Sequence, residues 1–294
     1  MRKLLIFLTV AVFLALLLLA AHIIYIHKYV PTEKFPEDTY LSKVEVKKAL
    51  VISAHDDDIC AMSGTISKLN KAGWEIKQLC FDSKDEARNE AHLKAASYIL
   101  DEASFFEIEG LPFRIVDDSI QYTWMPIPKE TFPKVYQKEL IKDELIKMII
   151  EFKPTVIFSL DNLLGGYGHP DHTFISGLVV EICKEDKRTV EKIYQSVFPD
   201  SYEEGLFPDL KNRASKYPSP YYAANEMYNI DGMPQPDVQV DIYENSWDKK
   251  MFLSTYLEGE RKNIRKYMPY YEHYPHWFYF WLFDKEYFRV LELK

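Results

Sequence analysis

Ala49-Leu50-Val51-Ile52-Ser53-Ala54 is an apolar run that leads directly into the charged stretch His55-Asp56-Asp57-Asp58. The run predicts a buried strand, and the pattern after the charged stretch predicts a helix. In α/β folds, ligand sites gather at strand ends. This part of the chain therefore predicts an α/β fold with a functional site at the end of its first strand.

Strand and helix patterns continue to alternate after this point. Alternating elements of this length predict a mostly parallel sheet with helices on both faces. Residues 202–241 are rich in Pro, Tyr and Asn and give no clear pattern, whereas the aromatic residues 270–288 are expected to cover the sheet edge or to rim the site. Strands are expected over residues 48–54, 75–81, 105–108, 155–160 and 192–198, and helices over residues 61–71, 85–100, 134–152, 171–183 and 247–266.

The composition indicates a globular domain and argues against binding of nucleic acid. Of the 294 residues, 47% are hydrophobic, which is enough to bury a full core. The net charge of −9 provides no basic surface to neutralise phosphates. Cys60, Cys80 and Cys183 all fall in apolar patterns, so we expect small core residues rather than disulfides or a cysteine-based zinc site.

The N-terminus predicts a membrane anchor. Leu4 to Ile26 contains no acidic or basic residue apart from His22, and 23 helical residues span about 34 Å, enough to cross a hydrocarbon core of about 30 Å. A cleaved signal peptide is the alternative, but its apolar region is normally only about 7–15 residues long, and Leu19-Ala20-Ala21 is a poor cleavage site. A core helix is disfavoured because every face is apolar. We therefore expect a single-pass membrane protein.

The anchor sets the expected domain organisation. Residues 1–28 would form the anchor, residues 29–45 a polar tether, and residues 46–294 one catalytic domain. Arg2-Lys3 favours a cytoplasmic N-terminus, but the lysines that follow the anchor weaken the charge asymmetry, so the side of the membrane stays open.

Three consecutive acids after a buried strand need an explanation. They repel one another unless a cation or several hydrogen-bond donors lie among them. One of them could simply cap the following helix. That interpretation leaves two acids and His55 unexplained, so we expect a cation at this place.

A second cluster, Tyr167-Gly168-His169-Pro170-Asp171-His172, follows the strand pattern at residues 155–160. The spacing of its histidines alone is weak evidence, since His273-Tyr274-Pro275-His276 has the same spacing but no strand before it and is expected to be structural. Gly165-Gly166 upstream would let the backbone approach a ligand. Two His and two Asp groups at one sheet edge suit one metal ion and still leave a carboxylate as base, which is typical of a zinc hydrolase.

At these residues the chain resembles the PIG-L/LmbE-like zinc-dependent de-N-acetylases. Ala54-His55-Asp56-Asp57-Asp58 is similar to the family's AHPDDE signature, and Tyr167–His172 to its HPDH signature with the preceding Tyr. The resemblance extends over about residues 48–198, and more loosely through Trp247-Asp248-Lys249-Lys250. It implies a Rossmann-like enzyme with one zinc ion per chain that removes acetyl from N-acetylglucosamine-type amides.

The resemblance also implies roles for individual residues. His55, Asp58 and His172 would hold the zinc, and Asp57 would be the general base. His169 and Tyr167 would stabilise the oxyanion and protonate the leaving amine. Arg88 would contact the substrate, with a salt bridge on the helix surface as the alternative.

Two positions depart from the signature, because Asp56 replaces its proline and Ile59 its glutamate. An inactive membrane-tethered carbohydrate-binding relative therefore remains an alternative, as does a metal-dependent amidase acting on another small amide. An anchor so near the domain would favour an N-acetylated amino sugar linked to lipid or to the cell envelope.

Overall fold

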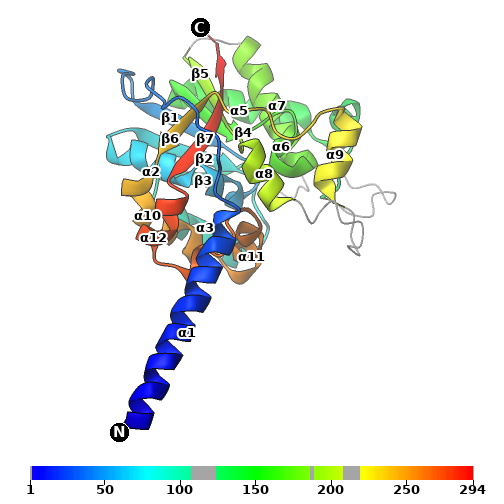
Figure 1. Cartoon of the computed structure of the whole chain (residues 1–294). Coiled ribbons are helices and arrows are strands. Elements are labelled where there is room, and N and C mark those ends of the chain that lie inside the picture. The colour runs from blue at the N-terminus through cyan, green and yellow to red at the C-terminus, as the bar shows by residue number, and fades with distance from the viewer. Residues whose placement is uncertain (1, 107–123, 186–188, 208–218, 294) are drawn as a thin grey trace.

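A seven-stranded sheet forms the centre of the computed structural model, which describes residues 2–106, 124–185, 189–207 and 219–293 (Figure 1). The strand order is β3-β2-β1-β4-β5-β7-β6. The first five strands of this order run parallel, whereas β7 lies antiparallel between β5 and β6. The strands are β1 (Lys48–Ile52), β2 (Glu75–Cys80), β3 (Glu102–Phe105), β4 (Val156–Leu160), β5 (Lys192–Ser196), β6 (Val238–Asp241) and β7 (Lys285–Glu292).

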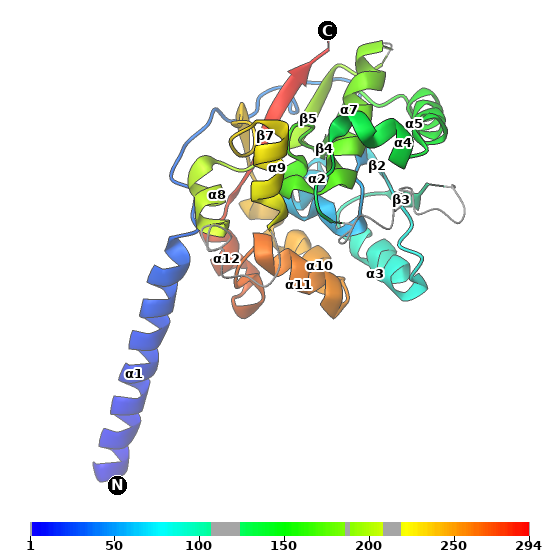
Figure 2. The same ribbon diagram turned by 90° about the vertical axis from the view of Figure 1, so that its right-hand side faces the viewer.

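Helices cover both faces of this sheet, so the predicted α/β fold class is confirmed (Figures 1 and 2). Short 3-10 turns, η1, η2, η4 and η5, lie at Asp56–Ala61, Lys129–Thr131, Tyr243–Asn245 and Tyr271–His273. The helices of the domain are α2 (Ser63–Lys71), α3 (Glu86–Ala96), α4 (Phe132–Val135), α5 (Lys138–Phe152), α6 (Gly165–Gly168), α7 (Pro170–Glu185), α8 (Asp200–Leu206), α9 (Pro220–Tyr228), α10 (Ser246–Thr255), α11 (Glu258–Tyr267) and α12 (His276–Leu282).

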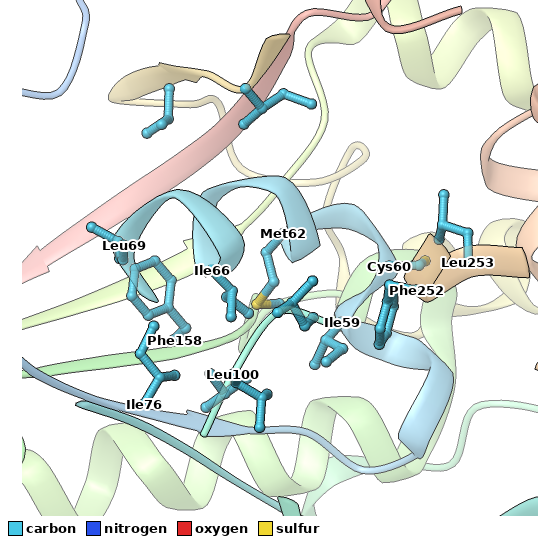
Figure 3. Packing of buried hydrophobic residues seen from close by; sticks show 14 of the residues in the cluster. Ile59, Cys60, Met62, Ile66, Leu69, Ile76, Leu100, Phe158, Phe252 and Leu253 are labelled. Atoms are coloured by element: carbon cyan, nitrogen blue, oxygen red, sulfur yellow. The ribbon is translucent and has the colours of Figure 1, made fainter. Parts of the chain in front are cut away.

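The apolar run of β1 supplies both halves of the core because successive strand residues point to opposite faces. Ala49 and Val51 pack into the cluster formed with α2, α3 and α10 to α12. Leu50 and Ile52 pack into the cluster formed with α5 and α7. Figure 3 shows part of the first cluster, where apolar side chains of η1 and α2 lie against those of β2, β4 and α10. A strand buried on both faces is what its unbroken apolar sequence predicts.

Several predicted elements differ from the structure. The third strand ends at Phe105 rather than beginning there, and residues 107 and 108 lie outside the described part of the chain. The helix expected over 134–152 is divided between α4 and α5, and the aromatic C-terminal stretch contains both α12 and the sheet strand β7. The helix expected over 247–266 is interrupted after Thr255, because Tyr256 is extended and its buried hydroxyl donates to the carbonyl of Asp56 at 2.8 Å.

The N-terminal helix α1 (Arg2–His27) projects from the domain (Figures 1 and 2). It is long and apolar enough to cross a membrane, and none of its most apolar stretch is buried within the protein. A signal sequence near the N-terminus would have the same length and composition, so the membrane-spanning role of α1 stays a prediction.

Residues 30–41, which we call the strap, connect α1 to the sheet without forming a free tether. Glu37 bridges to Gln239 of β6, and the side chain of Asp38 accepts a hydrogen bond from Tyr194 at 2.6 Å. Leu41 is buried in the core. The polar composition suggested a solvated segment, but these partners on β5 and β6 hold it along the sheet.

Candidate active site

The two sequence clusters meet at the carboxyl edge of the parallel strands. The first forms the loop and η1 after β1, and the second forms α6 and the start of α7 after β4. β1 and β4 are paired neighbours, so their carboxyl-terminal loops lie side by side. The sheet order changes direction between these strands, with β2 on one side and β5 on the other. Ligands of open α/β sheets bind at such a switch point.

The three predicted zinc ligands come together there. His55 Nδ1 lies 2.9 Å from His172 Nε2, which in turn lies 3.0 Å from Asp58 Oδ1. The remaining separation, from His55 Nδ1 to Asp58 Oδ1, is 3.7 Å. Two atoms that bind one zinc ion tetrahedrally at about 2.1 Å lie about 3.4 Å apart. The spacing of these atoms therefore fits one small cation.

Hydrogen bonds already orient this group. The carbonyl of Gly165 accepts from His172 Nδ1 at 3.0 Å, which turns Nε2 toward the site, and Asp58 Oδ2 accepts from the backbone N–H of His55 at 2.7 Å. Backbone partners of this kind commonly orient metal-bound histidines.

The electrostatics of the group also favour positive charge. Burial alone would lower the pKa of His55, but the carboxylates of Asp58 and Asp171 outweigh burial and hold that pKa well above its usual value. Against the opposing effect of burial, His172 and His55 hold the pKa of Asp58 well below its usual range. The carboxylates thus stabilise a positive charge among the rings, which suits a metal cation.

His169 brings a third ring to the same place. Ligand atoms of His55, His169 and His172 all lie within 4.8 Å of one another and could hold a metal ion. The described residues therefore contain two overlapping ligand sets, one completed by Asp58 and the other by His169. Burial lowers the pKa of His169 well below its usual value despite the neighbouring Asp171. This ring is therefore neutral near pH 7, in contrast to the cation expected for protonating an amine.

Asp171 and Tyr136 support these rings, and the sequence assigned neither a role. Asp171 Oδ2 lies 3.4 Å from His55 Nε2 and 3.6 Å from His169 Nδ1, and the backbone N–H of Asp171 donates to His169 Nδ1 at 3.2 Å. The Tyr136 hydroxyl donates to Asp171 Oδ1 at 2.6 Å. Asp171 belongs to the second sequence cluster, Tyr167–His172. Tyr136 lies in the segment between α4 and α5, where no sequence motif indicates a functional residue.

The glycine-rich loop before these histidines has a fixed conformation. Gly165 has a φ of +67°, and a Cβ atom there would lie 2.7 Å from the backbone nitrogen of Thr173. Asp161, which the sequence analysis did not identify, accepts hydrogen bonds from the backbone N–H groups of Leu163, Leu164 and Gly166 at 2.7–2.9 Å. The glycines therefore permit a close approach of backbone to backbone, and the buried Asp161 holds the loop in place.

Asp56, the residue that replaces the signature proline, is paired with Arg88. The Asp56 side chain is 3% exposed, and Arg88 Nε donates to its two oxygens at 3.0 and 3.1 Å. Arg88 also lies 3.4 Å from Asp57 and 3.5 Å from Glu260. Arg88 therefore forms salt bridges, but with acids of the site rather than on the helix surface.

Asp57, the predicted general base, has a pKa that is shifted toward neutrality. Burial, together with the charges of Asp56 and Asp58, raises its pKa to about 7, although Arg88 and His55 oppose this shift. A base with a pKa near the working pH is most effective in proton transfer.

The ring of Tyr167 lies beside the histidines of the site. Its ring lies 5.1 Å from the ring of His172 and 5.4 Å from the ring of Tyr267 at the end of α11. Burial raises the pKa of the Tyr167 phenol well above its usual value, so the phenol keeps its proton as a donor. The contact between Tyr167 and Tyr267 thus connects the second sequence cluster to the C-terminal helix α11.

His273 and His276, which have the same spacing as His169 and His172, do not lie at this site. His276 Nδ1 is hydrogen-bonded to Ser246 Oγ at 3.0 Å, and His273 lies beside Tyr270 with ring centroids 5.7 Å apart. Among the described residues, neither belongs to a metal-holding group. The two histidine pairs have the same spacing in the sequence, and only their surroundings in the fold distinguish the pair at the site from the structural pair.

Comparisons with known proteins agree with these features. Residues 50–183 match the model of the family described as PIG-L, GlcNAc-PI de-N-acetylase. This match confirms the resemblance and the class of enzyme that it implies, a de-N-acetylase. No curated protein matches the sequence.

Several solved structures match this one to different degrees. A deacetylase of teicoplanin biosynthesis, solved with teicoplanin, is 12% identical with a TM-score of 0.50, over 83% of this chain and 98% of that one. The N,N'-diacetylchitobiose deacetylase from Pyrococcus horikoshii is 17% identical with a TM-score of 0.45, over 87% and 94%. The hydratase GalB from Pseudomonas putida is 18% identical with a TM-score of 0.46, over 75% and 82%. Because all three sequence identities are low, these likenesses concern the fold alone, and only the teicoplanin deacetylase, with its TM-score of 0.50, supports a shared fold.

Proposed function

We propose that this protein is a zinc-dependent hydrolase that removes the N-acetyl group from an N-acetylglucosamine-containing glycoconjugate, linked to lipid or to the cell envelope. The observation that carries the proposal is the convergence of His55, His172 and Asp58, with Asp57 beside them at a pKa of about 7. The family match supports the reaction. The same proposal includes a membrane-spanning anchor formed by residues 1–28, a linking segment at residues 29–45 and a catalytic domain at residues 46–294; the length and apolar composition of α1 support the anchor.

His55, Asp58 and His172 would hold the ion, with His169 beside them as the other ring within reach. Bound there, zinc supplies a Lewis acid for the acetyl carbonyl and a bound water whose pKa is near 7. The protein's own part is to keep two imidazoles and a carboxylate pointing at one place, as the contacts to Gly165 and to the His55 backbone do.

Asp57 takes the proton of the attacking water. Its pKa of about 7 leaves a large fraction as carboxylate at neutral pH, and the protonated form is then acidic enough to give the proton to the departing amine. This assigns amine protonation to Asp57 in place of His169, whose buried ring is neutral.

Tyr167 and His169 stabilise the oxyanion. His169 accepts the Asp171 N–H through Nδ1, which leaves Nε2 to carry the proton and donate it. Removing one donor of this kind typically costs about 10²–10³ in rate. Arg88 acts through Asp56 and Asp57, because its guanidinium is engaged by these acids.

The test uses the full-length protein purified in detergent. Zinc content is measured by elemental analysis, and acetate release is measured with N-acetylglucosaminyl lipid and soluble N-acetylglucosamine conjugates. We expect one zinc per chain and acetate release that Asp57→Asn lowers by about 10² or more. Bound zinc without release from any of these amides would instead favour an amidase for another small amide, and neither zinc nor release would favour an inactive carbohydrate-binding relative.

A further inference from the structure

Three of the five tryptophans project into solvent near one end of the domain. Trp247, Trp277 and Trp281 are 55%, 55% and 64% exposed. Phe278 lies between the latter two, with ring centroids 6.0 Å from Trp277 and 6.3 Å from Trp281. Trp247 joins them through His276, 5.3 Å from its ring. We call Trp247, Trp277, Phe278 and Trp281 the aromatic patch.

The aromatic patch is continuous with the end of α1. The ring of Tyr274 lies 5.2 Å from Phe278, and its hydroxyl is hydrogen-bonded to His22 Nδ1 at 2.6 Å. Tyr270 also packs edge-on against His22, with centroids 4.8 Å apart. Figures 1 and 2 both show α11 and α12 at the end of the domain from which α1 projects. One row of aromatic side chains thus leads from α1 to the exposed face of α12.

With α1 spanning a bilayer, its length would place this row at the membrane surface. From Lys3 to His22 the helix rises about 29 Å, close to the hydrocarbon thickness of about 30 Å. With Lys3 at one interface, His22 lies at the other, and its partners Tyr270 and Tyr274 lie at the level of the headgroups. Tyr and Trp are the residues that favour this layer, where an apolar ring and a polar group are both accommodated.

We propose that the aromatic patch is a membrane-docking surface, inserted among the headgroups of the leaflet from which α1 emerges. The occupant is a lipid surface because α1, the apolar segment beside the patch, ends at that surface. The proposal rests on the membrane-spanning role of α1 in the proposed function. A solvated patch with three half-exposed tryptophans would otherwise leave a large apolar area in water.

Docking would hold the active site against the bilayer. Tyr267 lies against Tyr167 of the site, and only three residues later Tyr270 lies against His22. Three residues span at most about 11 Å. In addition, β7 leaves α12 at the carboxyl edge of the parallel strands, because Phe288 pairs with Ser196 at the end of β5. The patch, the anchor and the catalytic loops therefore share one edge of the sheet.

Tryptophan quenching tests the docking directly. Full-length protein is reconstituted in phosphatidylcholine vesicles whose acyl chains carry bromine near the headgroups. We expect strong quenching in the wild type, where three of the five tryptophans belong to the patch. In Trp277→Phe/Trp281→Phe the quenched share should fall to about one tryptophan in three, because Trp247 stays in the patch while Trp74 is buried in the domain and Trp124 lies outside the patch. Equal quenching of the wild type and the double variant would overturn the proposal.

A matched variant controls for nonspecific contact with lipid. Ile150 is 50% exposed near the end of α5, just before the amino end of β4 and therefore at the opposite edge of the sheet. In the double-variant background, Ile150→Trp should add unquenched fluorescence. Quenching of this tryptophan to the level of the wild-type patch would also contradict the proposed orientation.

Activity gives a second measurement. We expect Trp277→Ala/Trp281→Ala to lower kcat/KM about 10-fold for an N-acetylglucosaminyl lipid in vesicles, with no change for the same headgroup in soluble form. An equal decrease for both would assign the patch to sugar stacking and overturn docking. If no variant releases acetate, the proposed function fails, whereas the quenching result still decides whether the surface docks.

Discussion

The pairing of Arg88 with Asp56 makes a quantitative prediction about stability. The Asp56 side chain is 3% exposed and that of Arg88 25%, so the pair is largely withdrawn from water. Removing one partner of a buried pair costs about 3–5 kcal/mol, because the other charge remains without compensation. Arg88 is a quarter exposed and water relieves part of this cost, so we expect Arg88→Met to lower the free energy of unfolding by about 3 kcal/mol. Asp56→Asn should cost less, about 1–2 kcal/mol, because Arg88 keeps Asp57 and Glu260 nearby.

The assay is a double-mutant cycle on the full-length protein in detergent. Thermal unfolding of each variant is monitored by intrinsic tryptophan fluorescence. A loss of about 3 kcal/mol corresponds to a Tm decrease of about 6–12 °C for a domain of this size. The double variant Asp56→Asn/Arg88→Met should be more stable than the sum of the single effects predicts, by at least about 1 kcal/mol, because it leaves no unpaired Asp56 or Arg88 charge. Strict additivity, or an unchanged Tm in Arg88→Met, would refute the view that the two residues stabilise each other.

Three further predictions concern the site and its surroundings. His172→Ala should lose most of the bound zinc, whereas retention at wild-type stoichiometry would remove His172 from the ligand set. Asp57→Asn should keep the fold and the zinc but lower acetate release by about 10² or more, and activity within a few-fold of wild type would assign the base elsewhere. Glu203 is buried, and burial raises its pKa to about 8, although the Met233 N–H opposes this shift. Its folded pKa exceeds its unfolded value, so the stability contributed by the neutral form is complete below about pH 4.5 and is lost as the pH rises through 8. The Tm should therefore fall less between pH 6 and 9 in Glu203→Gln than in the wild type, and parallel curves would contradict the shift.

The sequence predicted those features that depend on local pattern. The apolar run before His55 and the strand at residues 156–160 are both buried strands, and parallel neighbours must place their carboxyl-terminal loops together. The meeting of the two histidine clusters therefore follows from the sequence pattern alone.

The features that the sequence did not reveal depend on contacts between distant residues. Tyr136 supports Asp171 from 35 positions away, and Tyr256 interrupts a continuous helical pattern because its hydroxyl reaches the Asp56 carbonyl. The strand β7 could not be recognised within the aromatic stretch, because aromatic residues occur in strands, as in β7, but here also in the helix α12 directly before it. In each case a partner far along the chain, rather than neighbouring residues, decides the conformation.

The strap along the sheet determines how the domain can move relative to α1. A flexible tether would let a domain tumble and would spread its active site over a hemisphere of positions. Here Asp38 is held by Tyr194, Leu41 is buried, and His22 of α1 is hydrogen-bonded to Tyr274. Rotation of the domain about the end of α1 would therefore break these contacts. With α1 in a bilayer, the catalytic loops keep one height and one face toward the surface. For the lipid-linked substrate proposed above, encounter would then be a two-dimensional search, whose rate depends on the fraction of membrane molecules that carry the acetamido group rather than on its bulk concentration.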